Sequence, residues 1–207
     1  MGLRRARGRP AQGGQAARLG DRRHQEGHGR RGLGGGDPRG AVTASPTPDD
    51  LEAVGAQLGR AARGVHAVAH RCPCALPDVV ATEPRLPDGT PFPTTFYLTC
   101  PRAASRIGSL EGSGLMKEME QRLRDDPELA AAYAGAHARY LEAREALGHV
   151  AEIDGISAGG MPDRVKCLHV LAAQSLAQGR GVNPLGDEVL DLLGEWWAPG
   201  PCVEPGA

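Results

Sequence analysis

The chain changes character abruptly near residue 47, and this change limits where a folded domain can lie. Residues 1–47 hold 12 of the 30 glycines and ten arginines, but no aromatic residue. Such a segment buries too little apolar surface to offset the entropy cost of ordering its backbone, about 1–2 kcal/mol per residue. We therefore predict a disordered basic arm at residues 1–47, one folded domain at residues 48–199 and a flexible tail at residues 200–207.

The charge of the arm raises the question of nucleic-acid binding. Residues 1–47 carry a net charge of +7, from ten arginines and three acidic residues, whereas residues 48–207 carry −8, from 14 basic and 22 acidic residues. Proteins that bind single strands also use aromatic side chains that stack on bases, and the arm has none. We do not expect nucleic acid to be a partner. We interpret the arm as a passenger segment, as would result from a misassigned start codon.

The apolar residues argue against a membrane protein. No run of about 18 apolar residues occurs, so we expect no membrane span. The first 30 residues have no apolar stretch of the kind that a secretory signal contains. We therefore predict a cytoplasmic protein, whose core relies mainly on Leu, Val and Ala because the chain has only seven aromatic residues.

The order of strand and helix patterns predicts an α+β fold. Short β-prone runs at residues 64–70, 79–82 and 94–99 are separated by turn sequences, which indicates an antiparallel sheet of about three strands. A helical majority follows, with apolar residues spaced three and four apart. Pro, Asp, Asn and Thr mark the expected helix starts, which are Thr47-Pro48, Pro101, Asp126-Pro127, Pro162-Asp163 and Asn183-Pro184.

Four cysteines are the best candidates for a functional site. With no export signal, a disulfide framework is not expected, and four thiols then suggest a metal. Zinc takes about four thiolate or imidazole ligands in a tetrahedron, and such a site would also stabilise a domain with few aromatic residues. We predict the ligands Cys72, Cys74, Cys100 and Cys167. Cys202 lies in the Pro/Gly tail and is left out.

Two histidines and two other interpretations remain open beside this zinc site. His70 and His169 each lie two residues from a predicted cysteine ligand and are the substitutes if one thiol is out of reach. In a regular helix, however, two positions correspond to about 200° around the axis, which separates Cys167 from His169. Four thiolates can also hold an iron–sulfur cluster, and buried free cysteines can simply pack as small apolar residues.

A second motif suggests an enzyme that handles phosphate. Residues 100–106 form a C-x5-R sequence between a predicted strand and a predicted helix, which is where cysteine phosphatases place their phosphate loop. Cys100 would be the nucleophile and Arg106 the clamp on the phosphoryl oxygens. The segment has no glycine, and Pro101 removes one backbone donor, so the motif is incomplete.

A glycine pair provides a further candidate for anion binding. Gly159 and Gly160 precede the predicted helix start at Pro162, and Arg164 and Lys166 follow in its first turn. A helix N-terminus with two nearby cations can hold a phosphate or carboxylate. A mobile loop followed by a capped helix explains the same residues, and we favour this interpretation over an anion site.

Several motifs together resemble an uncharacterised actinobacterial family, domain of unknown function 501. The similar stretches are residues 70–74 (HRCPC), 84–94 (PRLPDGTPFPT), 97–101 (YLTCP), 164–169 (RVKCLH) and 181–187 (GVNPLGD). The resemblance covers about residues 48–197 and implies a small cytoplasmic bacterial protein without assigned catalytic residues. It also implies a link to cell division or polyphosphate metabolism, by association with neighbouring genes for a septum-formation initiator, enolase and an exopolyphosphatase.

These observations leave three functional hypotheses. The first is a structural or regulatory zinc protein that uses the cysteine cluster. The second is a cysteine-dependent, phosphatase-like or other anion-handling enzyme that uses Cys100 and Arg106, or Arg164 and Lys166. The third is an interaction module, without a metal, for a cell-division or envelope protein.

Overall fold

Three short strands form one antiparallel sheet, in agreement with the prediction from the sequence. The computed structural model describes residues 45–156 and 158–204 and places the strands in the order β1-β2-β3. They are β1 (Val65–Arg71), β2 (Pro77–Thr82) and β3 (Phe96–Leu98). Every residue of β2 is buried, because this central strand pairs with both neighbours and is contacted by helix α1 (Pro48–Leu58) on one face and by helix α5 (Leu168–Gln178) on the other. β3 pairs with β2 alone and is therefore an edge strand.

One helix precedes the sheet, and a helical majority follows it. The helices of the described residues are α1 (Pro48–Leu58), α2 (Pro101–Gly112), α3 (Leu115–Asp125), α4 (Pro127–Leu147), α5 (Leu168–Gln178) and α6 (Pro184–Leu193). This order confirms the α+β class. The described residues lie within one compact unit, and the predicted arm at residues 1–47 falls almost entirely outside them.

Local capping residues begin and end the helices where the sequence predicts. The Thr47 hydroxyl accepts a hydrogen bond from the Asp50 N–H, and the Asp50 carboxylate accepts one from the Thr47 N–H, which forms a capping box at α1. Gly59 ends α1 in the left-handed conformation, with φ of 65°. The Asn183 side chain accepts the Gly186 N–H at the start of α6.

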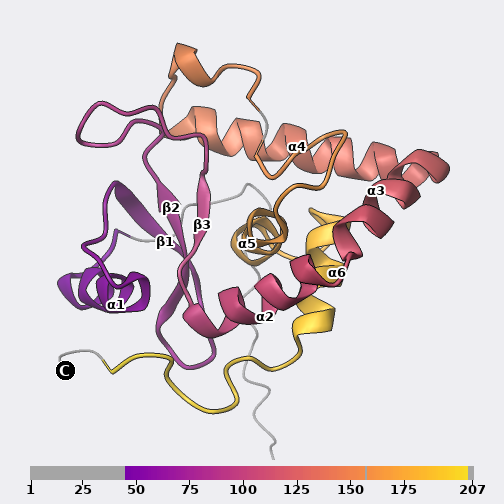
Figure 1. The fold of residues 1–207 in the computed structure, drawn as a ribbon. Coiled ribbons are helices and arrows are strands. Elements are labelled where there is room, and N and C mark those ends of the chain that lie inside the picture. The colour runs from indigo at the N-terminus through magenta and orange to yellow at the C-terminus, as the bar shows by residue number, and fades with distance from the viewer. Residues whose placement is uncertain (1–44, 157, 205–207) are drawn as a thin grey trace, which may run out of the picture. The chain divides into compact units, whose positions relative to one another are not determined.

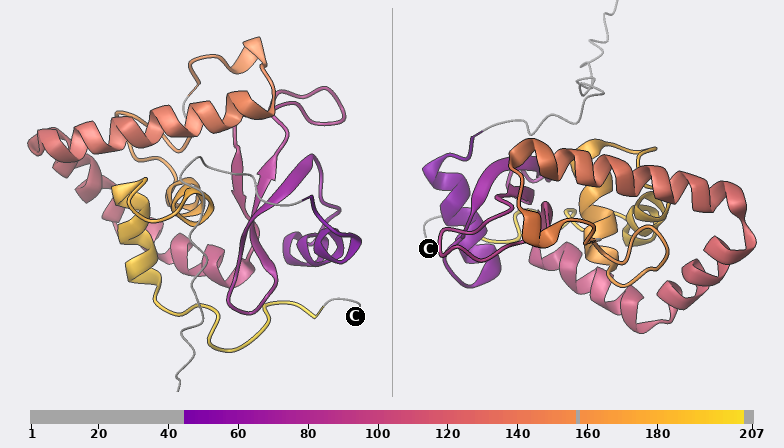
Figure 2. Two further views of the ribbon diagram at one scale, coloured as in Figure 1. Left: turned by 180° about the vertical axis from the view of Figure 1, so that it is seen from behind. Right: turned by 90° about the horizontal axis from the view of Figure 1, so that it is seen from above.

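Helix α5 is the centre of the core. It lies on one side of the sheet, against β3, whereas α1 lies on the other side (Figure 1). The view from behind shows α5 end-on between the sheet and the helices α3 and α6 (Figure 2). The buried face of α5 includes Leu168, Leu171 and Ala172, so a single helix brings the sheet and the helical layer together.

Two details of the prediction are corrected. Helix α5 begins at Leu168 and not at Pro162, because tertiary and turn contacts use the backbone donors that precede it. The Val165 N–H donates to Glu120 Oε1 of α3 at 3.2 Å, and the Lys166 N–H donates to the Gly159 carbonyl at 2.7 Å. In α1, the apolar residues Leu51, Val54 and Leu58 are spaced three and four apart, a pattern that predicts a buried face, but Leu51 is 40% exposed.

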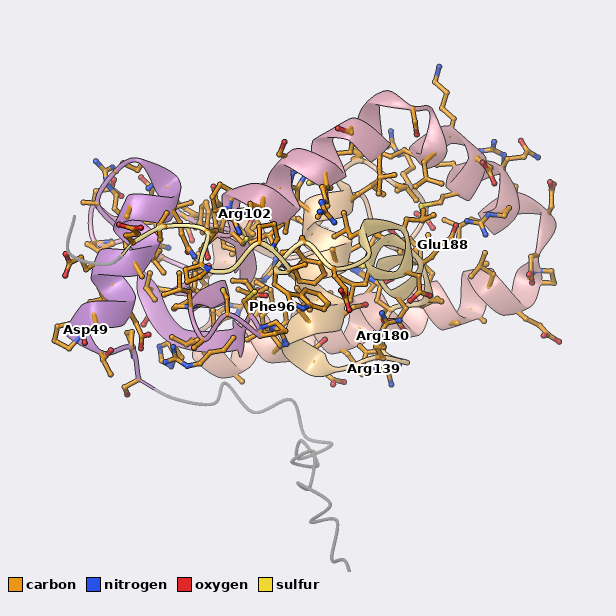
Figure 3. All side chains as sticks on the ribbon, turned by 90° about the horizontal axis from the view of Figure 1, so that it is seen from below. Asp49, Phe96, Arg102, Arg139, Arg180 and Glu188 are labelled. Atoms are coloured by element: carbon orange, nitrogen blue, oxygen red, sulfur yellow. The ribbon has the colours of Figure 1, made fainter. Side chains whose placement is uncertain are left out.

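The segment after α6 runs back across the start of α2 toward α1 (Figures 1 and 3). Arg102, which Figure 3 labels beside this segment, donates from Nη1 to the Gly200 carbonyl at 2.6 Å. Cys202 packs against the core, and its Sγ lies 3.3 Å from Gln57 Nε2. The first residues of the predicted flexible tail therefore make specific contacts with α1 and α2.

Among the described residues, no helix combines the length and the apolar composition that crossing a bilayer would require. This finding agrees with the expectation that the sequence contains no membrane span.

Candidate functional site

A cavity of ≈ 570 Å³ lies beside the edge strand β3. Its walls come from the end of α1, from β3, from the start of α2 and from the start of α5, so segments far apart in the sequence enclose it. Most of its lining is apolar. The lining residues are Gln57, Leu58, Thr94, Phe96, Tyr97, Leu98, Thr99, Pro101, Ala104, Cys167, His169 and Val170.

Cys167 and His169 bring ionisable side chains to the wall of this cavity. Cys167 is the N-cap of α5 and has an extended backbone, with φ of −155° and ψ of 107°. His169 lies in the first turn of the same helix. Because Cys167 is outside the helix, the 200° separation expected for a regular helix does not apply. The Cys167 Sγ lies 3.9 Å from His169 Nδ1.

Glu111, at the end of α2, completes the cluster. Its Oε1 lies 3.1 Å from His169 Nδ1 and also accepts the Leu168 N–H at 2.7 Å, so the start of α5 holds this carboxylate in place. Ligand atoms of Glu111, Cys167 and His169 all lie within 4.8 Å of one another, and each residue is partly buried. We call these three residues the Glu-Cys-His cluster.

The second ring nitrogen of His169 has a fixed partner. Nε2 lies 3.2 Å from the carbonyl oxygen of Ala104 in α2, which can only accept a hydrogen bond. A proton on Nε2 therefore leaves Nδ1 directed at the other two members of the cluster. The hydrogen bond with Cys167 raises the pKa of His169 to about 9; the Glu111 charge also raises it, and partial burial opposes both.

The spacing of the cluster fits the edges of a zinc tetrahedron. With zinc–ligand distances of about 2.0–2.3 Å, a tetrahedron has nitrogen–oxygen edges of about 3.4 Å and sulfur–nitrogen edges of about 3.6 Å. The distances here are 3.1 Å between His169 Nδ1 and Glu111 Oε1, and 3.9 Å between His169 Nδ1 and Cys167 Sγ. Three protein ligands leave one tetrahedral position for water or another molecule, as in catalytic zinc sites.

Residues 68–191, more than half of the chain, match a family described as a protein of unknown function, DUF501. The chain belongs to the DUF501 family. The matched segment contains all three residues of the Glu-Cys-His cluster and ends before Cys202. No curated protein and no solved structure matches the chain.

The four predicted cysteine ligands of this DUF501 protein do not form one set. Of the described residues, two groups of three His, Cys, Asp or Glu side chains bring ligand atoms within 4.8 Å, and Cys167 is the one predicted cysteine in them. The other group, Glu145, His149 and Asp154, is fully exposed and contains no predicted ligand.

The other predicted ligands have structural surroundings of their own. Cys72 is buried in the turn between β1 and β2, and burial raises the pKa of its thiol to about 12. Burial likewise raises the pKa of Cys100 to about 11, and the nearby Cys202 thiol contributes. His70 Nδ1 lies 2.7 Å from Oδ1 of the buried Asp78. Neither Cys72 nor Cys100 belongs to a group of three possible ligands within 4.8 Å among the described residues.

The C-x5-R sequence is integrated into the packing of α2. Cys100 is the N-cap of this helix and is 1% exposed, while the Arg106 Nη1 donates to the Leu193 carbonyl at the end of α6, at 2.6 Å. Arg106 thus binds backbone of another helix. The phosphatase-like interpretation stays a prediction, to which these contacts lend no support.

Arg164 and Lys166 line a second, polar cavity of ≈ 190 Å³, together with His137. The backbone N–H groups of Arg164 and Lys166 donate to the Gly160 and Gly159 carbonyls, so they are already used within the turn. Any anion in this cavity would depend on the side chains. The anion-site prediction also stays open.

Two residues near the predicted ligands were not expected from the sequence. Glu111 belongs to the Glu-Cys-His cluster, and Cys202 lies near Cys100. Glu111 lies 56 positions before Cys167 in the sequence and belongs to no motif, so no local signal connects it with the cysteine. Cys202 does carry a signal, because it is the fifth cysteine of the chain, but its position in a Pro/Gly segment argued for a flexible tail.

Proposed function

We propose that this protein binds zinc through Glu111, Cys167 and His169, with one coordination position open to the cavity beside β3. The observation that carries the proposal is the convergence of a carboxylate oxygen, a thiol sulfur and an imidazole nitrogen, with the other imidazole nitrogen on a backbone carbonyl. Histidines that bind metals usually donate their second N–H to such a partner, which orients the ring. This revises the predicted four-cysteine set but keeps zinc as the cofactor.

The open position favours a zinc that acts on a bound molecule over one that only supports the fold. Structural zinc sites are closed by four protein ligands, whereas sites with three protein ligands keep a water. Zinc lowers the pKa of such a water to about 7 and so supplies a hydroxide for hydrolysis near neutral pH. The adjacent cavity, at ≈ 570 Å³, is within the size range of small-molecule sites. A zinc-dependent hydrolytic enzyme is therefore the function that we propose.

Metal analysis of the purified chain tests the proposal. We expect about one zinc per chain, and at least about a hundredfold weaker zinc binding in each of the variants Glu111→Gln, Cys167→Ser and His169→Gln. Cys74→Ser is the matched control: it removes a partly exposed cysteine outside the cluster, and zinc binding should stay unchanged.

Cobalt substitution distinguishes this cluster from the four-cysteine site. The thiolate-to-cobalt absorption grows with the number of sulfur ligands, so the proposed cluster gives the band of a single thiolate. A band of several thiolates, together with loss of metal in Cys74→Ser, would instead establish the four-cysteine set. A chain that takes up no metal would overturn both.

The location in the cytoplasm, which the sequence predicts and the family resemblance also implies, remains a proposal. The connection to cell division is a proposal that comes from the family resemblance alone. Pull-down with and without residues 110–147, which include all of α3 and α4, tests for a cell-division or envelope partner.

A further inference from the structure

A third cavity lies where α1 meets the sheet. It has a volume of ≈ 270 Å³, and its walls come from the end of α1, from β1, from β2 and from the connection between β2 and β3. Apolar side chains form most of these walls, among them Val54, Val65, Val80, Leu86 and Phe92. A ligand in this cavity would therefore place an apolar body against the sheet.

Two arginines line the same cavity. Arg60 and Arg63 follow α1 and are exposed, and neither forms an ion pair with a carboxylate among the described residues. The side chain of Arg60 makes one hydrogen bond, to the Ala61 carbonyl at 3.5 Å. Hydrogen bonds from Thr90 lower the pKa of Asp88, and the charge of Arg63 makes a smaller contribution in the same direction.

Charge complementarity thus favours a ligand whose acidic group lies beside the apolar walls of this cavity. Guanidinium groups bind carboxylate and phosphate oxygens through paired hydrogen bonds. Elsewhere in the described residues, four arginines already pair with carboxylates at 2.7 Å; they are Arg71, Arg85, Arg122 and Arg180. Within residues 45–156 and 158–204, Arg60 and Arg63 have no such partner, which leaves them available to an acid from solution.

The two cavities are neighbours in the fold. Leu58 at the end of α1 and Tyr97 on β3 line both of them. These two side chains are therefore a wall common to both cavities, which an elongated molecule would contact in reaching from the arginines toward the cavity that contains Cys167 and His169. The walls of the cavity beside α1 disfavour a sugar-rich ligand, because Thr82 and Tyr97 are the two uncharged residues with a hydroxyl group among those lining it, and most buried sugar hydroxyls would lack partners.

We propose that the cavity between α1 and the sheet binds an anionic amphiphile. Its acidic group lies on Arg60 and Arg63, and its apolar body lies against Leu58 and Tyr97. Binding depends on the cavity and the two arginines alone. The further step, that anionic amphiphiles are the substrate class of the zinc site, rests on the proposed function above.

Calorimetric titration of the metal-free full-length chain tests the binding step. The probes are octanoate, which has both the charge and the chain, octan-1-ol, which lacks the charge, and acetate, which lacks the chain. We expect saturable binding of octanoate below about 1 mM, and at least tenfold weaker binding of the other two. No saturable binding of octanoate, or equal affinity for octanoate and octan-1-ol, would overturn the proposal.

Variants locate the site and separate this proposal from the zinc site. The double variant Arg60→Gln/Arg63→Gln should weaken octanoate binding at least tenfold, whereas Arg180→Gln, an exposed arginine outside both cavities, should not change it. Unchanged octanoate binding in the double variant would refute the role of the arginines. Cys167→Ser should lose zinc but bind octanoate like the original chain. An original chain that binds octanoate but takes up no zinc would refute the proposed function alone.

Discussion

The packing of α5 on α6 depends on the absence of a side chain at Gly186. A Cβ at this position would overlap the Leu171 carbonyl oxygen of α5 and lie 2.5 Å from Ser175 Oγ, whereas real Cβ contacts essentially never fall below 3.0 Å. The Leu171 carbonyl belongs to the buried face of the central helix and cannot turn away as a flexible side chain could. Gly186→Ala must therefore push the two helices apart.

The expected cost follows from two opposing effects. Overpacking of a well-packed core costs about 1–3 kcal/mol, and the upper end applies here because the overlap is with backbone. Alanine returns about 1 kcal/mol through its higher helix propensity. We expect Gly186→Ala to lower the free energy of unfolding by about 2 kcal/mol.

Gly108→Ala is the matched control, because Gly108 is also within a helix, α2, but has no atom within 4 Å of the added Cβ. It should raise the free energy of unfolding by about 0.5–1 kcal/mol. Urea unfolding, followed by circular dichroism, measures the free energy of unfolding of both variants. The two free energies can be compared if the m-values of the variants are equal. If Gly186→Ala proved as stable as Gly108→Ala, the close approach of α5 and α6 would be refuted.

Two further predictions concern polar groups that stabilise the fold. The hydrogen bond from Arg71, with a smaller contribution from Thr47, lowers the pKa of Asp50 from 3.8 to about 2. This stabilises the folded state above the unfolded pKa and is lost as the pH falls from about 4 to 2. Since Arg71 is 44% exposed, we expect about 1 kcal/mol. Asp50→Asn should thus be less stable at neutral pH and equal to the original chain near pH 2 in urea titrations, and a pH-independent difference would contradict this reasoning. Tyr140→Phe removes the buried hydroxyl that accepts the Thr95 N–H at 2.7 Å, and should cost about 1–3 kcal/mol. Tyr97→Phe, on the partly exposed side of β3, should change stability by less than about 0.5 kcal/mol, and equal losses in the two variants would show that the Tyr140 hydrogen bond is unimportant.

Local sequence determined most of the secondary structure, because the interactions that define it lie within a few residues. The capping box of Thr47 and Asp50 and the left-handed Gly59 delimit α1 without help from the rest of the chain. The three β-prone runs, the Asp126-Pro127 start of α4 and the Asn183-Pro184 start of α6 were predicted for the same reason.

Tertiary structure alone decided where α5 begins and which side chains meet at its start. Pro162 offered a plausible helix start, but Glu120 and Glu111 come from distant helices to bind the N–H groups of Val165 and Leu168. Those long-range hydrogen bonds leave Cys167 extended and bring it toward His169 and Glu111. Spacing in the sequence contains no information about such an encounter, because it depends on how α2 and α5 pack together.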